Sequence, residues 1–209
     1  MGGDVQLLES WRSGDESAGE ALVGAHYDSV LRFFRTKAGD DADDLVQRTF
    51  LRCVEPRSTF RGLSTFRAFL FGVARNVLFE HIRSRVRDRK VDPDFGVSSI
   101  LDLEPRASTL AFEKAEQRQL VHALQLLPVD IQLTLELYYW EELSVDEVAE
   151  ALEIPPGTVK SRLHRGRTLL RDAIDNAPAD AGMHSVRAQL DAWVSEVRSQ
   201  HPAARDADS

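Results

Sequence analysis

A basic segment at residues 157–171 has the residue types and spacing of a helix that contacts nucleic acid. It holds five Lys/Arg and no acid. On a helix its apolar residues would share one face, and its polar and basic residues would share the opposite face. The apolar face comprises Val159, Leu163, Gly166 and Leu170, and the opposite face Lys160, Ser161, His164, Arg165 and Thr168, with Arg162 and Arg167 on its flanks. Cationic and hydroxyl groups in this pattern can bind phosphates and base edges.

A shorter amphipathic helix is expected just before this segment, from Ser144, which can cap it, to Leu152. Pro155 and Pro156 cannot lie inside a helix, so the chain must turn there. Two helices joined by a tight turn predict a helix-turn-helix whose second helix enters a major groove. A helical hairpin with a merely solvated basic face is the alternative. The turn position that often holds Gly is Glu153, and positive φ is costly for other residues, so we expect a turn of different geometry.

The charge distribution favours local contacts with phosphates. The chain has 209 residues and a net charge of −8, which alone argues against a polyanionic partner. Residues 61–90, however, hold eight Lys/Arg and two acids. Two basic segments in an acidic chain predict local phosphate contacts with little general affinity for polyanions.

The elements that must position these segments are all expected to be helices. Apolar residues recur at helical spacing along most of the chain, no strand-like alternation stands out, and we predict an all-α fold. The expected helices span residues 4–36, 41–54, 64–87, 111–127, 129–140 and, near the C-terminus, 184–200. Residues 88–110 lose the periodicity and contain Pro93, Gly96 and Pro105, which indicates a flexible linker. This predicts domains at 1–87 and 111–175, with an extension at 176–209.

The remaining motifs argue against an enzyme. Cys53 is the single cysteine, and the six histidines are scattered without a metal-binding spacing. Phosphate-cradling glycines and nucleophile motifs such as GxSxG are absent. We therefore expect no metal, no cofactor and no catalytic residue. No apolar run reaches the length of a membrane span and the N-terminus lacks a secretory signal, so we expect a soluble, cytoplasmic protein without membrane insertion.

Three segments, in this order, resemble bacterial RNA polymerase sigma factors of the compact extracytoplasmic-function (ECF) group of the sigma-70 family. They are DADDLVQRTFLR, FRGLSTFRAFLFGVARNVLFEHIRSR and the segment from LPVDIQLT to RTLLR. The resemblance covers roughly residues 15–175. It implies a region 2 helical bundle and a region 4 helix-turn-helix domain. It also implies a non-catalytic protein that binds core RNA polymerase and promoter DNA, aids melting, and is restrained by an anti-sigma factor or other regulator.

The resemblance assigns site residues to three surfaces. Contacts with core polymerase are expected from Asp41, Asp44, Leu45, Gln47, Arg48 and Phe50, of which Leu45 should also help bury its helix. Contacts with the −10 element are expected from Arg61, Ser64, Thr65, Arg67, Arg75, Asn76, Glu80, Arg83 and Arg85. Contacts with the −35 element are expected from Thr158, Lys160, Ser161, Arg162, His164, Arg165 and Arg167. Among the last set, Thr158, Arg162 and Arg167 are expected to anchor phosphates.

Two further readings compete with the sigma factor. One is a dimeric helix-turn-helix regulator that binds duplex DNA without polymerase. The other is a helical adaptor without a nucleic-acid role, against which the two basic segments argue. The extension 176–209 carries one amphipathic helix with Trp193 in its apolar stripe. A lone helix of this length is marginal in water, so it should dock, either as a regulatory or partner-binding element or as a permanent part of the −35 domain.

Overall fold

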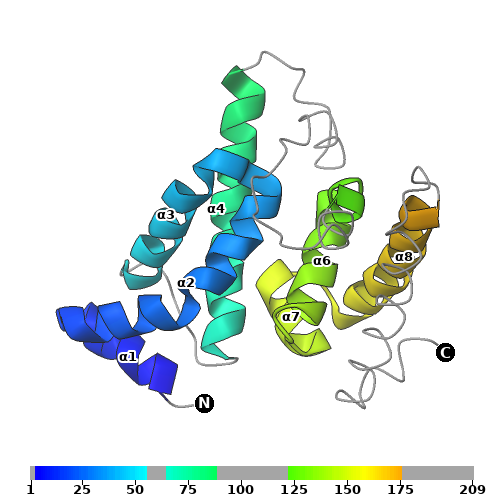
Figure 1. Cartoon of the computed structure of the whole chain (residues 1–209). Coiled ribbons are helices and arrows are strands. Elements are labelled where there is room, and N and C mark those ends of the chain that lie inside the picture. Colours follow the sequence, from blue (N-terminus) through cyan, green and yellow to red (C-terminus); the bar gives the residue numbers. More distant parts are fainter. Residues whose placement is uncertain (1–2, 56–64, 89–121, 176–209) are drawn as a thin grey trace. The chain divides into compact units, whose positions relative to one another are not determined.

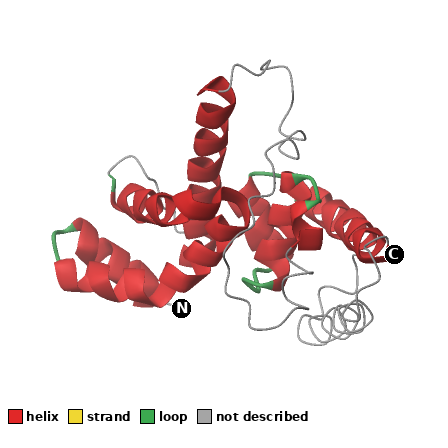
Figure 2. Ribbon diagram, turned by 45° about the horizontal axis from the view of Figure 1, so that its top comes forward, coloured by secondary structure: helices red, strands yellow, loops and turns green. Residues whose placement is uncertain are grey.

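All regular structure that the computed structural model describes is helical. The described residues are 3–55, 65–88 and 122–175, and Figures 1 and 2 show their helices. The elements are α1 (Gly3–Arg12), α2 (Glu16–Ala38), the short 3-10 helix η1 (Gly39–Asp41), α3 (Ala42–Val54), α4 (Phe66–Asp88), α6 (Val129–Tyr139), α7 (Val145–Leu152) and α8 (Pro156–Asp175). The predicted all-α class is confirmed. The predicted linker from residue 89 onward and the extension 176–209 lie outside the described residues.

The described helices belong to two compact units, one formed by α1 to α4 with residues 146–154, the other by α6 and α8. In the first unit α3 packs against both α2 and α4. Phe34, Leu45, Leu70 and Phe71 are completely buried between these helices. The ring centroid of Phe33 lies 5.6 Å from that of Phe71, which joins α2 to α4. Burial of these large apolar side chains is the main stabilising contribution to the unit.

The first helix differs from the prediction, because the expected helix 4–36 is broken into α1 and α2. Gly14 adopts φ +101°, a conformation that a helix cannot contain. The Asp15 carboxylate then caps α2 by accepting hydrogen bonds from the amides of Ser17 (3.0 Å) and Ala18 (3.3 Å). The apolar periodicity continues on both sides of this turn, which is why the sequence pattern concealed it. As a result α1 folds back onto α2 (Figure 1).

The second unit presents α8 on the surface of a nearly buried helix. Every residue of α6 from Ile131 to Tyr139 is buried. The predicted apolar face of α8 is confirmed, since Val159, Leu163 and Leu170 are at most 2% exposed. Gly166 lies on the same face, against α6. Burial of this face fixes which side of α8 is turned to solvent.

Candidate nucleic-acid and protein interfaces

The outward face of α8 carries the polar residues that the sequence analysis placed there. Ser161, His164, Arg165 and Thr168 are exposed, opposite the buried apolar face. Lys160 and Thr158, also in the predicted set, are half-buried beside this face. Hydroxyl, imidazole and guanidinium groups on successive turns can donate hydrogen bonds to phosphates and to base edges. This surface therefore has the composition of a recognition helix.

Two other predicted cations of α8 are turned toward α6. The Arg162 guanidinium forms an ion pair with Asp130, with 3.0 Å between Nη2 and Oδ2. Arg167 donates from Nη1 to the Tyr139 hydroxyl at 3.5 Å. Both arginines help to hold α8 on α6, and their predicted role as phosphate anchors remains a prediction. The exposed Arg171 was counted in the basic segment but not assigned to the site, although its spacing of seven residues from His164 indicates the same face.

The turn of the helix-turn-helix is built around a left-handed residue. Glu153 has φ +54°, so our expectation of a different geometry is wrong. The Glu153 amide donates to the Glu150 carbonyl at 3.1 Å and the Ile154 amide to the Ala149 carbonyl at 3.0 Å. These two bonds are the Schellman pattern that ends a helix at a left-handed residue. They stabilise the turn enough to offset the conformational cost of a residue that is not Gly. Pro156 then begins α8, a position where its missing amide hydrogen costs nothing.

On α4 a stripe of exposed polar residues runs along one side of the helix. Asn76, Glu80, Arg83 and Arg87 are exposed and follow one another at spacings of four, three and four residues. These spacings place them on one face, which we call the α4 stripe. Three of the four belong to the predicted −10 set. Arg87 was missed, although its i, i+4 relation to Arg83 could have revealed it.

Arg75 lies beside the α4 stripe, and its Nη1 donates to Oδ1 of Asn76 at 3.4 Å. Its guanidinium carbon is 5.1 Å from the centroid of the Phe79 ring, a cation–π contact. Its Nη1 also forms an ion pair with Oε2 of Glu153 at 2.9 Å. These contacts engage the side chain both with its own helix and with the turn after α7. A contact between Arg75 and DNA would have to replace or share them.

Four more of the predicted −10 residues belong to the start of α4 or to the chain just before it. The Thr65 hydroxyl accepts a hydrogen bond from the Ala68 amide at 3.3 Å and caps the helix. Arg67 is half-buried, whereas Arg61 and Ser64 lie outside the described residues. Phe66 and Phe71, at most 3% exposed, lie in the core. The expected contacts of Arg61 and Ser64 with the −10 element therefore remain predictions.

The outward face of α3 is a mixed polar and apolar surface. Asp44, Gln47 and Arg48 from the predicted polymerase-binding set are exposed on it, and Asp44 and Arg48 form an ion pair at 3.5 Å. Leu51 continues the same face at i+4 from Gln47 and is 55% exposed. The sequence analysis did not assign Leu51 to the polymerase-binding set. We call Asp44, Gln47, Arg48 and Leu51 the α3 surface.

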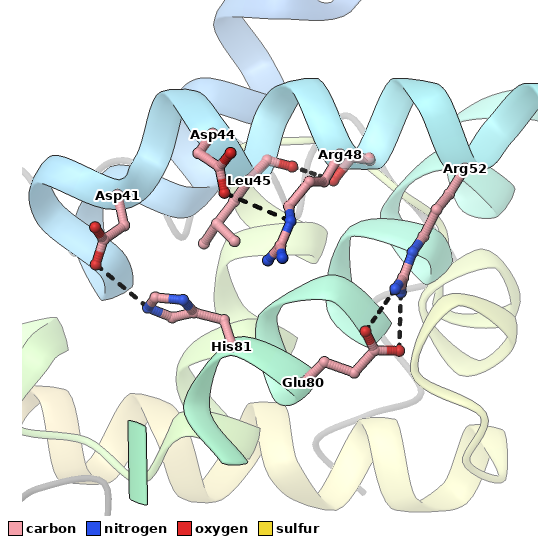
Figure 3. A network of polar contacts seen from close by, with 8 residues as sticks. Asp41, Asp44, Leu45, Arg48, Arg52, Glu80 and His81 are labelled. Carbon is pink, nitrogen blue, oxygen red and sulfur yellow. Dashed lines mark hydrogen bonds and ion pairs between the residues drawn. The ribbon is translucent and has the colours of Figure 1, made fainter. Parts of the chain in front are cut away.

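The other three residues of the predicted polymerase-binding set face inward or toward α4. Leu45 and Phe50 are buried, so they contribute to the packing of α3. Asp41, at the start of α3, directs its Oδ2 toward α4, where Arg85 Nη1 lies at 3.2 Å. His81 Nε2 lies 3.6 Å from the same oxygen (Figure 3). Arg85, expected to contact DNA, is therefore an interhelical ion-pair partner here.

His81 is a mostly buried base beside this ion pair. The 3.6 Å separation from Asp41 is too long for a hydrogen bond, and within the described part of the chain His81 Nε2 has no hydrogen-bond partner. Burial lowers the pKa of His81, and the nearby Arg85 and Arg48 lower it too, against the opposing effect of Asp41. The imidazole is consequently neutral at pH 7.

The opposite end of the α3–α4 contact is held by a bidentate ion pair. Arg52 Nη1 and Nη2 donate to Oε1 and Oε2 of Glu80 at 2.8 and 2.5 Å (Figure 3). The hydrogen bonds from Arg52 lower the pKa of Glu80, so its carboxyl stays ionised. Glu80, predicted to contact the −10 element, is thus joined to the helix that carries the α3 surface.

No other chemistry is evident in the described part of the chain. Burial raises the pKa of the Cys53 thiol to about 12, which leaves it unreactive. No group of three or more His, Cys, Asp or Glu among the described residues is placed to hold a metal ion. None of the described helices combines the length and the apolar character that crossing a membrane requires. The exposed polar surfaces on α3, α4 and α8 are the candidate interfaces.

The chain combines a helical unit that has a partly basic stripe with a helix-turn-helix that has a basic outward face. These two features are typical of helical DNA-binding proteins. Comparison with known families identifies the member. The model of sigma-70 region 2 matches residues 22–88, and that of sigma-70 region 4 matches residues 117–170. RNA polymerase sigma-H factor of Pseudomonas aeruginosa is 31% identical over 185 residues, which are 83% of this chain and 93% of the relative. The chain belongs to the ECF group of the sigma-70 family of RNA polymerase sigma factors.

Other relatives agree in sequence and in fold. ECF RNA polymerase sigma factor SigW of Bacillus subtilis is 28% identical, over 78% of this chain and 92% of its own length. The structure of CnrH in complex with the cytosolic domain of CnrY has a TM-score of 0.61 at 23% identity, covering 84% of this chain and 99% of that chain. The protein is accordingly a non-catalytic subunit that binds core RNA polymerase and directs promoter-specific transcription initiation. This excludes the reading as a dimeric regulator that acts without polymerase.

Proposed function

We propose that this sigma factor divides promoter recognition and polymerase binding among the three surfaces. The outward face of α8 reads the −35 element, Asn76, Arg83 and Arg87 of the α4 stripe contact the −10 element, and the α3 surface binds core polymerase. The observation that carries the proposal is that α8 buries Val159, Leu163 and Leu170 and exposes Ser161, His164 and Arg165 on the opposite face. A helix of this kind can enter a major groove while its apolar face stays packed on α6.

The −35 assignment is tested by single changes on α8. Arg165 can make a bidentate contact with guanine, so Arg165→Ala should cost about 1–3 kcal/mol and relax preference at one position of the −35 element. Arg171→Ala, a change on the same face, should weaken binding uniformly across sequences if it contacts phosphate. Holoenzyme binding to promoters with each −35 base substituted measures both. A uniform loss for Arg165→Ala would place that residue among the phosphate contacts.

The −10 assignment depends on Asn76 and Arg83. An amide at Asn76 can bond an exposed base edge, and Arg83 can pair with the backbone. Asn76→Ala should therefore reduce sequence preference in holoenzyme binding to a single-stranded −10 oligonucleotide, while Arg83→Ala should reduce affinity for all sequences. Unchanged preference in Asn76→Ala would remove Asn76 from the reading residues.

The polymerase assignment is tested with two exposed leucines. Leu51, at the C-terminal end of the α3 surface, is 55% exposed, and Leu126, in the second unit, is 44% exposed. A carboxylate that is buried in an interface without a partner is costly, so Leu51→Asp should weaken core binding about tenfold or more. Leu126→Asp is the matched control and should leave core binding unchanged. Equal affinities of the two variants for core would refute the assignment.

We further propose that the protein acts in the cytoplasm and is restrained there by an anti-sigma protein. The support comes from the solved relatives: CnrH was determined with the cytosolic domain of CnrY, and RpoE of Bartonella quintana with the anti-sigma factor NepR. The expected partner would compete with core polymerase. A protein captured with the tagged chain must therefore block holoenzyme formation when added back in purified form, and a captured protein that leaves core binding intact is not an anti-sigma factor.

The extension 176–209 remains a proposed regulatory or partner-binding element outside the described residues. Run-off transcription with core polymerase, comparing the full chain with one that ends at Asn176, measures its effect. Higher activity of the shortened chain would identify an inhibitory element, and lower activity a stimulating one. Equal activity would favour a permanently packed helix.

A further inference from the structure

Glu80 is the single acid among the four residues of the α4 stripe, and it is surrounded by arginines. Arg52 binds it through both carboxylate oxygens, and Arg48 and Arg83 lie close enough to favour its ionised form. The side chain of Glu80 is 53% exposed and that of Arg52 37% exposed, so the pair lies at the surface. A surface that binds phosphates thus has an ionised carboxylate in its middle.

Two roles for such a carboxylate differ in what its oxygens do. A Glu that reads DNA accepts a hydrogen bond from the amino group of cytosine and needs an oxygen directed at the base. In this protein both oxygens accept from one guanidinium, and the fork geometry holds the carboxylate plane facing Arg52. An exposed ion pair adds little to stability, so stability alone does not account for the arrangement. Its clearer effect is to neutralise a charge that phosphates would repel.

We propose that Arg52 is a positioning residue that screens the Glu80 carboxylate from promoter DNA, and that Glu80 does not read a base. The proposal rests on the −10 role of the α4 stripe proposed above. Arg52 belongs to α3, next to the α3 surface, so it reaches the DNA-binding stripe from the polymerase-binding helix. A bare carboxylate about 7 Å from one phosphate in water would weaken binding about threefold, and the effect would fall with added salt.

The test is a double-mutant cycle on Arg52 and Glu80 in the holoenzyme formed with the full-length chain. Core polymerase is saturated with wild type, Arg52→Ala, Glu80→Gln or the double variant, and binding is measured to a promoter selected from a randomised pool by the wild-type holoenzyme. We expect Arg52→Ala to bind about threefold or more weakly at low salt, Glu80→Gln to bind as well as wild type, and the double variant to recover most of the loss. Sequence preference at the −10 element should be unchanged in Glu80→Gln.

Other outcomes overturn the proposal. Loss of −10 preference in Glu80→Gln would make Glu80 a base reader, and equal losses in Arg52→Ala and the double variant would make the pair structural. Arg35→Ala, an exposed arginine on α2, controls for the loss of one positive charge, and melting temperatures confirm that each variant folds. The proposed function has its own controls in Asn76→Ala and Arg83→Ala. If Asn76→Ala and Arg83→Ala both leave binding unchanged, the proposed −10 role of the α4 stripe is wrong, whatever the result of the double-mutant cycle on Arg52 and Glu80.

Discussion

The close approach of α8 to α6 at Gly166 predicts that adding one methyl group there destabilises the −35 unit. A Cβ on Gly166 would lie 2.8 Å from Ile131 Cγ2 and 3.0 Å from Leu135 Cδ1, shorter than packed carbon atoms allow. Overpacking of this kind costs about 1–3 kcal/mol. Alanine gains about 1 kcal/mol over glycine in a helix interior, so Gly166→Ala should destabilise the unit by about 1 kcal/mol net.

Gly24→Ala in α2 is the control, because it adds the same methyl group but is expected to stabilise the protein. A Cβ added there would meet nothing within 4 Å, so Gly24→Ala should stabilise its helix by about 1 kcal/mol. Hydrogen exchange followed by peptide reports each unit separately, which a single melting curve would not. We expect lower protection in α6 and α8 for Gly166→Ala and higher protection in α2 for Gly24→Ala. Increased protection in α8 for Gly166→Ala would refute the close contact of α6 with α8.

Three further predictions concern single side chains. Arg12 donates two hydrogen bonds to the Cys53 carbonyl (3.2 and 2.7 Å), so Arg12→Ala should cost about 1–3 kcal/mol and expose α1 to hydrogen exchange, with Arg12→Lys rescuing only in part. Glu153→Gly should stabilise the turn by about 0.5–1 kcal/mol in urea denaturation, because glycine adopts the φ of +54° without strain. The pKa of His81 is lowered from 6.5 in the folded chain, so the unfolded chain binds the proton more readily and stability should fall as pH drops below about 6.5. His81→Gln should flatten that dependence in denaturation curves recorded between pH 5.5 and 7.5.

The helices and their buried faces could be predicted from sequence, because the apolar residues that a helix buries recur along the sequence with a period of about 3.6 residues. Val159, Leu163 and Leu170 were assigned to one face and are buried there. The turn at Gly14 and Asp15 was not predicted, because apolar spacing continues through it and the signal depends on two residues only. The left-handed Glu153 was mispredicted for a related reason. Backbone hydrogen bonds compensated its conformational cost, and no side-chain pattern records such bonds.

The direction in which each arginine points could not be predicted, since it depends on acids that are distant in sequence. Arg85 pairs with Asp41, 44 residues away, and Arg52 with Glu80, 28 residues away. Helical spacing assigns a residue to a face of its own helix, but not to a partner on the next helix. The predicted −10 set therefore combined residues of the exposed stripe with residues engaged between helices.

These internal pairs bear on why an acidic protein with two basic segments should read DNA selectively. Arg75, Arg85 and Arg162, three cations of those segments, lie within 3.2 Å of carboxylates of the same chain. Each pair lowers the positive charge that a nonspecific polyanion would meet. Arg83 on α4 and Arg165 on α8 are exposed and keep their positive charge available for the proposed contacts. Affinity that depends on few phosphates falls only gently with salt and is weak on random DNA. If α4 and α8 read the two elements as proposed, we expect tight promoter binding to require the base contacts of both helices at once.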